Sequence, residues 1–286
     1  MRVMLLGAGG MLGHDLVVTA PRDVALFSST RAKLDITNYA AIAARVTEVR
    51  PDIIINAAAY TAVDRAESEP DLALKVNGEA VGELGKIAAQ ARVRLLHFST
   101  DYVFDGTRAG PYGEDDAPKP VNTYGATKLA GEAALRASGA DMLIIRTQWL
   151  FGANGRSFPR TMWERAFQEL PTKVVNDQTG KPTYTVDLAE ATWQLAQAGV
   201  AGLVHIANSG STTWYELASH IFRLAGKPRL VTPCSSDEYP TAARRPRNSV
   251  LSTANAEAHL GYRLPQWRSA VERFITSAFS KPVASL

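Results

Sequence analysis

The segment that decides the fold of this chain is Val3-Met4-Leu5-Leu6-Gly7-Ala8-Gly9-Gly10-Met11-Leu12-Gly13. Its four apolar residues predict a buried strand, the glycines predict a tight turn, and the apolar residues that follow predict a helix. Glycines at 7, 10 and 13 let a phosphate approach the backbone and let the helix pack on the sheet. The N–H groups that open such a helix bind a pyrophosphate. The segment therefore predicts dinucleotide binding through Gly7, Gly10 and Gly13, with a plain tight turn as the alternative.

Strand and helix patterns alternate five or six times from this segment to Ile145. Helices are expected at Tyr39–Val49 and 67–93, and strands at 24–27, 52–61, 95–98 and 142–150. The run from Asp52 to Thr61 is continuously apolar and ends in small residues, which predicts burial on both faces and close approach of a ligand. This alternation predicts an α/β fold, a Rossmann-like doubly wound parallel sheet with ligands at the carboxyl ends of its strands.

The alternation weakens beyond Gly152. We expect residues 1–152 to form the dinucleotide-binding domain, with later segments returning to it, and residues 153–286 to form mainly a smaller C-terminal substrate-binding lobe. In that lobe helices are expected at 157–168, from Thr185, near 214–225 and at 265–278, and strands at 173–176 and 203–207. The tail Ser280–Leu286 is expected to be frayed.

Composition limits the classes of function. The chain has 286 residues, 46% of them hydrophobic, and a formal charge of +3 without a long basic face, so neither nucleic acid nor membrane is expected as a partner. The amino terminus enters a strand at once, without a targeting leader. Cys234 is the only cysteine and the histidines are scattered, which favours a reducing, cytoplasmic location and no metal site. The basic run Arg244–Arg247 is either a solvated loop or a phosphate contact.

Candidate catalytic residues follow the apolar run Leu95–Phe98. Thr100 and Asp101 come at the expected carboxyl end of that strand, and Tyr124 and Lys128 follow four residues apart on one predicted helix face. An ammonium close to a phenol lowers the phenol's pKa from its usual value of about 10, which makes a better proton donor. The alternative is a chance pairing of tyrosine and lysine on a solvated face.

Cofactor preference is read from the end of the second expected strand. Ser28, Ser29, Thr30 and Arg31 stand there in place of an acidic residue that would bind a ribose 2′-hydroxyl. An arginine suits a 2′-phosphate, so NADPH is favoured over NADH, although Arg31 could be a surface residue. Asp35 either reaches the adenine end or forms a turn.

Motifs over the whole chain resemble the extended short-chain dehydrogenase/reductase superfamily and, within it, the dTDP-4-dehydrorhamnose reductases. They are Gly7-x-x-Gly10-x-x-Gly13, the segments 56–64 and 99–104, Tyr124-Gly125-x-Thr127-Lys128, Arg146-Thr147-x-Trp149, the segment 175–183, Thr212-Thr213-Trp214 and Arg245-Pro246-x-Asn248-Ser249. The resemblance implies an oxidoreductase that uses NADPH or NADH to reduce the C4 ketone of dTDP-4-dehydro-6-deoxy-L-mannose to dTDP-L-rhamnose, a precursor of polysaccharide.

The resemblance also implies roles for single residues. Tyr124 would protonate the developing alkoxide, Lys128 would lower the pKa of Tyr124 and hold the nicotinamide ribose, and Thr100 would bond the carbonyl oxygen. Asp101 and Trp149 would contact the sugar, although Trp149 could be a core residue. The residues implied to line the cofactor are Gly10, Met11, Leu12, Asp35, Ile36, Ala59, Tyr60 and Thr61, beside Tyr124 and Lys128.

Two other functions and two oligomeric states remain open at this stage. The superfamily motifs are shared with nucleotide-sugar epimerases and dehydratases, and one branch of the family consists of cofactor-binding regulatory subunits without catalysis. Some relatives dimerise through a carboxylate-bound magnesium ion, but no full set of such ligands aligns here. We therefore expect no obligatory metal, and a monomer or a homodimer.

Overall fold

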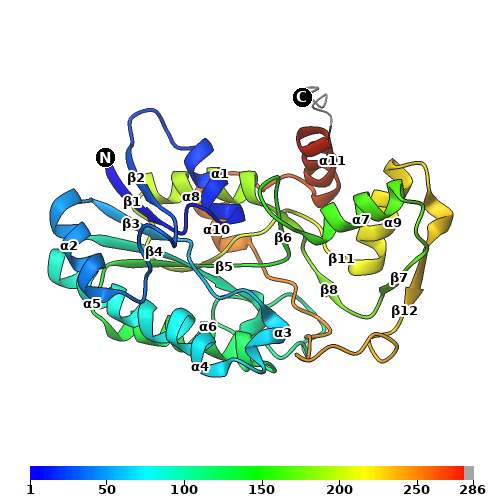
Figure 1. Ribbon diagram of the computed structural model, residues 1–286, viewed down its shortest axis with the longest axis horizontal. Coiled ribbons are helices and arrows are strands. Elements are labelled where there is room, and N and C mark those ends of the chain that lie inside the picture. Colours follow the sequence, from blue (N-terminus) through cyan, green and yellow to red (C-terminus); the bar gives the residue numbers. More distant parts are fainter. Residues whose placement is uncertain (280–286) are drawn as a thin grey trace.

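Six parallel strands form the centre of the computed structural model, which describes residues 1–279 (Figure 1). Their order across the sheet is β10-β5-β4-β3-β1-β2. The strands are β1 (Arg2–Leu6), β2 (Ala25–Ser29), β3 (Ile53–Asn56), β4 (Arg94–Thr100), β5 (Met142–Thr147) and β10 (Gly202–His205). Because strand order reverses between β1 and β3, the crevice at their carboxyl ends is the position where such sheets bind ligands. The predicted doubly wound parallel sheet is confirmed.

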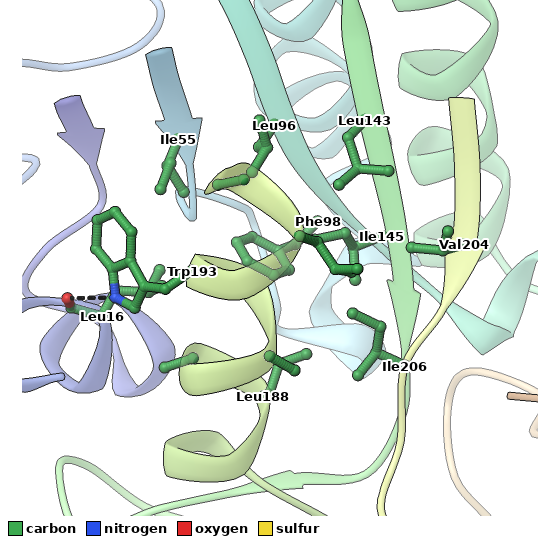
Figure 2. Packing of buried hydrophobic residues seen from close by; sticks show 14 of the residues in the cluster. Leu16, Ile55, Leu96, Phe98, Leu143, Ile145, Leu188, Trp193, Val204 and Ile206 are labelled. Carbon is green, nitrogen blue, oxygen red and sulfur yellow. Dashed lines mark hydrogen bonds between the residues drawn. The ribbon is translucent and has the colours of Figure 1, made fainter. Parts of the chain in front are cut away.

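Helices cover both faces of the sheet. One face carries α1 (Met11–Val18), α8 (Thr185–Gln197) and α10 (Ala254–Leu260); the other carries α2 (Tyr39–Val49), α5 (Ala80–Ala91) and α6 (Thr123–Ala137). Figure 2 shows the first face, where Phe98 and Ile145 of the sheet lie opposite Leu188 of α8. On the same helix, Trp193 Nε1 donates to Leu16 O at 3.2 Å, which ties α8 to α1. A helix from the second half of the chain thus completes the first half's core.

A second set of elements packs at one end of this sheet, on the side where α7, α9, β7 and β12 gather in Figure 1. It contains α7 (Phe158–Phe167), α9 (Trp214–Leu224) and α11 (Trp267–Phe279) around their own apolar cluster. Three two-stranded sheets accompany them: β7 (Thr172–Val175) with β12 (Val231–Cys234), β8 (Thr179–Gly180) with β11 (Thr212–Thr213), and β6 (Leu150–Phe151) with β9 (Thr183–Tyr184).

Several boundaries differ from the sequence expectation. The strand expected at 52–61 ends at Asn56, because the Asn56 side chain accepts a hydrogen bond from Ala58 N and turns the chain out of the sheet. The helix expected at 67–93 is divided into α4 (Pro70–Leu74), a π-helical turn (Lys75–Glu79) and α5, and a separate short helix, α3 (Val63–Ala66), precedes α4. The π-helical turn places Asn77 so that it bonds both the N–H and the carbonyl of Tyr60. Helix α10 had no sequence expectation.

Three further observations complete the fold. Short 3₁₀ turns lie at Asp101–Val103 and Pro228–Leu230. Among residues 1–279, no helix has the length and apolar character to cross a membrane. The expected fraying of Ser280–Leu286 falls outside the described residues.

Candidate active site

The glycine turn after β1 leaves no room for a side chain at Gly7 or at Gly13. Gly7 has a φ of 83°, and a Cβ there would lie 2.6 Å from Ala58 N. A Cβ on Gly13 would lie 2.1 Å from Gly7 O, so the first turn of α1 rests directly on the glycine turn. Gly10 N closes the turn by donating to Gly7 O at 3.0 Å. The predicted glycine roles, tight turning and close packing, are therefore explained by contact distances.

A hollow of about 560 Å³ opens beside this turn at the carboxyl ends of β1 and β3. Helix α1 begins there, and its N-cap residue, Gly10, has no side chain to bond the first N–H groups, which suits a pyrophosphate. The implied cofactor residues that line the hollow are Gly7, Gly10, Arg31, Asp35, Ile36, Ala59, Tyr60 and Thr61. Met11, Leu12 and Gly13 form the first turn of α1 instead, and Tyr124 and Lys128 are not on this wall.

Arg31 and Asp35 stand together at the rim of this hollow. Arg31 Nε donates to Asp35 Oδ2 at 3.2 Å, and most of the Arg31 side chain is exposed. The other oxygen, Asp35 Oδ1, accepts from Thr37 N at 2.9 Å and from its hydroxyl at 2.8 Å. The backbone bond from Thr37 lowers the pKa of Asp35 most, and Arg31 adds to it. Asp35 is thus a turn-forming residue that also lines the hollow, so the two sequence interpretations are compatible.

The second group of candidate residues meets where β4 ends and α6 begins. Thr100, at the end of β4, donates from Oγ1 to Asp101 Oδ1 at 3.0 Å and accepts from Tyr102 N. Tyr124 lies in the first turn of α6, which Asn122 caps by accepting from Gly125 N at 2.8 Å. A Cβ on Gly125 would lie 2.1 Å from Tyr102 O, so glycine there lets α6 press against the end of β4.

Burial dominates the electrostatics of Tyr124 and Lys128. It raises the pKa of Tyr124 to about 12, opposed by the Thr100 hydroxyl. It lowers the pKa of Lys128 to about 8, opposed by the carboxylate of Glu132. Lys128 Nζ donates to Phe98 O at 2.6 Å rather than to the phenol. The pKa of Tyr124 therefore moves opposite to the sequence expectation, because loss of hydration outweighs any attraction to the ammonium.

Asp101 is a buried carboxyl at the same place. It is 2% exposed, and no well-formed hydrogen bond from residues 1–279 reaches Oδ2. Burial raises the pKa of Asp101 to about 7, opposed by the nearby Ser249 and Thr100 hydroxyls. Tyr102, the next residue, packs edge-on against the Tyr124 ring at 5.8 Å between ring centres. Thr100 and Asp101 are therefore buried together, and the half-buried Tyr124 lies beside them.

A second hollow, of about 670 Å³, extends from Tyr102 toward α7 and α9. Its wall contains three basic side chains, Arg165, Lys173 and Arg245, and the aromatic rings of Phe158, Trp214 and Tyr239. Arg245 is anchored by an ion pair with Asp64, so this part of the basic run is neither a free loop nor a free phosphate contact. Sequence reasoning missed Arg165, Lys173 and Tyr239, since isolated residues carry no spacing signal.

Trp149, the implied sugar contact, lies behind this wall. Its ring stacks on Trp214 with 3.6 Å between ring centres and 9° between planes, and it is Trp214 that faces the hollow. Trp149 also has a φ of 48°, an uncommon left-handed conformation for a large side chain. A Cβ on Gly180 would lie 2.4 Å from the Trp149 ring, so glycine leaves room for the stack. Trp149 therefore supports the ring of Trp214, and it is the Trp214 ring that lines the hollow.

Comparisons with known proteins agree with this architecture. The family described as RmlD substrate binding domain matches residues 1–279. The chain is 40% identical over 295 residues to dTDP-4-dehydrorhamnose reductase of Escherichia coli (strain K12), covering 98% of this chain and 99% of the relative. It is 42% identical over 278 residues to a protein of that name from Streptomyces griseus, covering 94% and 91%. A crystal structure of dTDP-4-dehydrorhamnose reductase from Bacillus anthracis str. Ames in complex with NADP matches with a TM-score of 0.93 and 37% identity, covering 96% and 99%.

Proposed function

The chain belongs to the RmlD substrate-binding domain family, and from this premise we propose that it reduces the C4 ketone of dTDP-4-dehydro-6-deoxy-L-mannose with NADPH, forming dTDP-L-rhamnose. One observation carries the proposal. The Thr100 hydroxyl lies beside Tyr124 at the carboxyl end of β4, and Lys128, one helical turn from Tyr124, donates to Phe98 O of the same strand. The first hollow opens at the carboxyl ends of β1 and β3 in the same sheet. The second hollow begins at Tyr102, next to Tyr124.

The dinucleotide fits the first hollow because its pyrophosphate would meet the uncapped start of α1 and its adenosine would lie against Ala57–Ala59. When bound, the reduced nicotinamide supplies a hydride to the ketone carbon. Arg31 is exposed at the rim and suits a 2′-phosphate, which favours NADPH. The Bacillus anthracis relative was solved with NADP, in agreement with this preference.

Tyr124 holds the proton that the reduced oxygen requires. A pKa of about 12 keeps the phenol protonated at neutral pH, and Oη releases the proton only when negative charge develops on the carbonyl oxygen. The Thr100 hydroxyl lies next to that phenol, and by turning its single proton from Asp101 Oδ1 to the carbonyl oxygen it can donate to the oxygen that Tyr124 protonates. Lys128, one helical turn from Tyr124, carries the positive charge that stabilises the phenolate left behind. General acid catalysis of this kind contributes about 10²–10⁴-fold.

The nucleotide sugar has a chemically matched place in the second hollow. Arg165 and Lys173 offer positive charge for a diphosphate, and the face of Trp214 offers a stacking surface for the base. Asp101 then lies at the sugar end, beside Thr100. On this proposal Asp101 contacts the sugar, and Trp149 supports Trp214 rather than contacting the sugar itself.

We also place the activity in the cytoplasm, because a single cysteine suits a reducing compartment. Neither a nucleic acid nor a membrane is part of the proposed reaction. Either a monomer or a homodimer can carry it out, since all the named side chains come from one chain. No group of three His, Cys, Asp or Glu side chains in residues 1–279 could hold a metal ion, and no metal is included.

Tyr124→Phe tests the mechanism. Purified protein is mixed with NADPH and enzymatically generated ketosugar, nicotinamide absorbance is followed, and dTDP-L-rhamnose is identified by chromatography. The variant should lose at least about 100-fold in kcat while still binding NADPH. Tyr262→Phe, at a tyrosine that is 41% exposed, serves as the matched control and should keep full activity. A Tyr124→Phe protein with normal kcat would refute the role of the phenol.

The wild-type protein distinguishes the remaining functions in the same assay. Oxidation of NADPH in proportion to the sugar formed supports reduction. A sugar product formed without NADPH consumption would instead indicate an epimerase or a dehydratase. Cofactor that binds without any change in the sugar would indicate a regulatory subunit.

A further inference from the structure

Three buried polar side chains, Lys128, His97 and Asn56, form a hydrogen-bonded series that we call the relay. Lys128 Nζ lies 3.2 Å from His97 Nε2, and His97 Nδ1 lies 3.1 Å from Asn56 Nδ2. Asn56 and His97 are fully buried, and Lys128 is 2% exposed. The relay ends at the N–H of Ala58, a residue on the wall of the first hollow. None of the roles assigned above uses His97 or Asn56.

The orientation of the Asn56 amide is fixed by its other contact. Ala58 N is a backbone donor, and it lies 3.1 Å from Asn56 Oδ1. A donor requires an acceptor, so the oxygen of Asn56 must face Ala58 and its NH₂ group must face His97. This assignment leaves one choice for the imidazole: Nδ1 has to accept the hydrogen bond from Asn56.

The tautomer of His97 then determines which protonation state Lys128 can have. Burial and the neighbouring Lys128 keep the pKa of His97 well below its usual value, so the ring is neutral and carries one proton. With Nδ1 accepting, that proton is on Nε2 and points at Lys128 Nζ. A neutral amine can accept this proton and still donate to Phe98 O, whereas an ammonium has no lone pair.

We infer that His97 and Asn56 are positioning residues that stabilise the neutral amine form of Lys128, and that protonation of Lys128 forces the Asn56 amide to turn. In the alternative arrangement Lys128 donates to Nε2, the His97 proton moves to Nδ1, and Asn56 must present its oxygen to the ring. The Asn56 NH₂ group then faces Ala58 N, and that backbone donor loses its acceptor. The charge of Lys128 is therefore linked to a hydrogen bond on the wall of the first hollow.

Few other groups affect the protonation states of Lys128 and His97. Glu132, one turn further along α6, favours the charged form of Lys128, and it is itself held by Arg146 and Ser99. Tyr124 lies one turn earlier on the same helix. Among the described residues, Lys128 is the only titratable group that shifts the pKa of His97 apart from burial. The relay therefore opposes Glu132 in setting the protonation state of Lys128.

The consequence for catalysis rests on the proposed function. If a charged Lys128 stabilises the Tyr124 phenolate, the reductase rate falls as Lys128 loses its proton, near pH 8 in the wild-type protein. The relay sets the position of this fall. The tautomer of His97, by contrast, can be measured without any substrate, so failure of the proposed function and failure of the relay are distinguishable.

The first test is ¹⁵N nuclear magnetic resonance of the histidine rings in the full-length protein, with His97→Gln used to assign the His97 signals. The spectra are recorded on either side of pH 8. Above this pH, where Lys128 is neutral, His97 should carry its proton on Nε2. A proton on Nδ1 there would overturn the inference, whether or not the protein reduces the ketosugar.

The second test is Asn56→Asp, which replaces the amide donor by a carboxylate acceptor of the same shape. A carboxylate accepts from Ala58 N and from a protonated Nδ1, which frees Nε2 to accept from a charged Lys128. The pH at which kcat falls should rise by on the order of one to two pH units, because protonation of Lys128 in this variant no longer breaks the hydrogen bond from Ala58 N to residue 56. The His97 proton should move to Nδ1 in the same variant.

Two controls separate the relay from simple charge. Asn38→Asp adds the same charge at an exposed helix cap and should leave the pH profile unchanged. In a His97→Leu background the shift caused by Asn56→Asp should disappear, since the relay is broken. A shift of equal size in that background would show that the added charge acts through space, and would overturn the role of His97. If Asn56→Asp does not fold, the tautomer of the wild-type ring still decides the inference.

Discussion

Replacing Asp101 by asparagine should make the stability of the protein less dependent on pH. The carboxyl is buried, and its pKa rises from 3.8 to about 7 in the folded state. Below pH 3.8 it is protonated in both the folded and the unfolded chain, so it adds no pH dependence. Between the two values only the folded chain holds the proton, so the wild-type free energy of unfolding falls as pH rises, and above about pH 7 the loss is complete.

The size of the effect follows from the shift. A rise of about three pH units corresponds to about 4 kcal/mol, which is the largest change expected across this range. Asparagine keeps an acceptor for the Thr100 hydroxyl but has no proton to lose, so this slope is absent in Asp101→Asn. Any cost of burying the new amide is the same at every pH. The difference between variant and wild type should therefore grow in favour of the variant as pH rises.

Urea unfolding at a series of pH values below and above 7 measures this difference, with the transition midpoint and slope fitted for both proteins. Taking the difference cancels the other titrating groups, because their sites are unchanged. Asp115→Asn, at an exposed aspartate of the loop before α6, is the matched control and should give a flat difference. A flat difference for Asp101→Asn as well would refute the argument that the folded chain holds this carboxyl protonated.

Three further changes have defined expectations. Gly13→Ala places a Cβ 2.1 Å from Gly7 O, so NADPH binding by fluorescence titration should weaken at least about 10-fold; normal affinity would contradict the packing argument. Glu132→Gln leaves the buried Arg146 guanidinium without its carboxylate and should cost about 3–5 kcal/mol in urea unfolding. Replacing both Glu132 and Arg146 by methionine should recover most of the lost stability. A Glu132→Gln protein as stable as wild type would exclude the ion pair as a stabilising contact. Arg31→Ala should lower the ratio of kcat/KM for NADPH over NADH by about 10–100-fold, and an unchanged ratio would assign the 2′-phosphate to another residue.

Local sequence patterns were sufficient for the elements of the central sheet. The apolar run before Gly7 and the glycines after it specify strand, turn and helix, because a side chain at Gly7 or Gly13 would collide with backbone atoms. The tyrosine and lysine four residues apart specify a shared helix face, since this spacing is a property of the helix alone. The π-helical turn at Lys75–Glu79 escaped prediction because it depends on the contact between Asn77 and Tyr60.

What the sequence determined by itself was the separate strands, the glycine turn and the identity of the candidate catalytic residues, because these depend on residues close together in the chain. The tertiary structure decided the surroundings of those residues. It buried Lys128 against Phe98 and His97, which sets its pKa to about 8, and it put Trp149 behind Trp214. Burial and hydrogen-bond partners arise from segments distant in the chain, so spacing carries no information about them, and they control which proton each group holds.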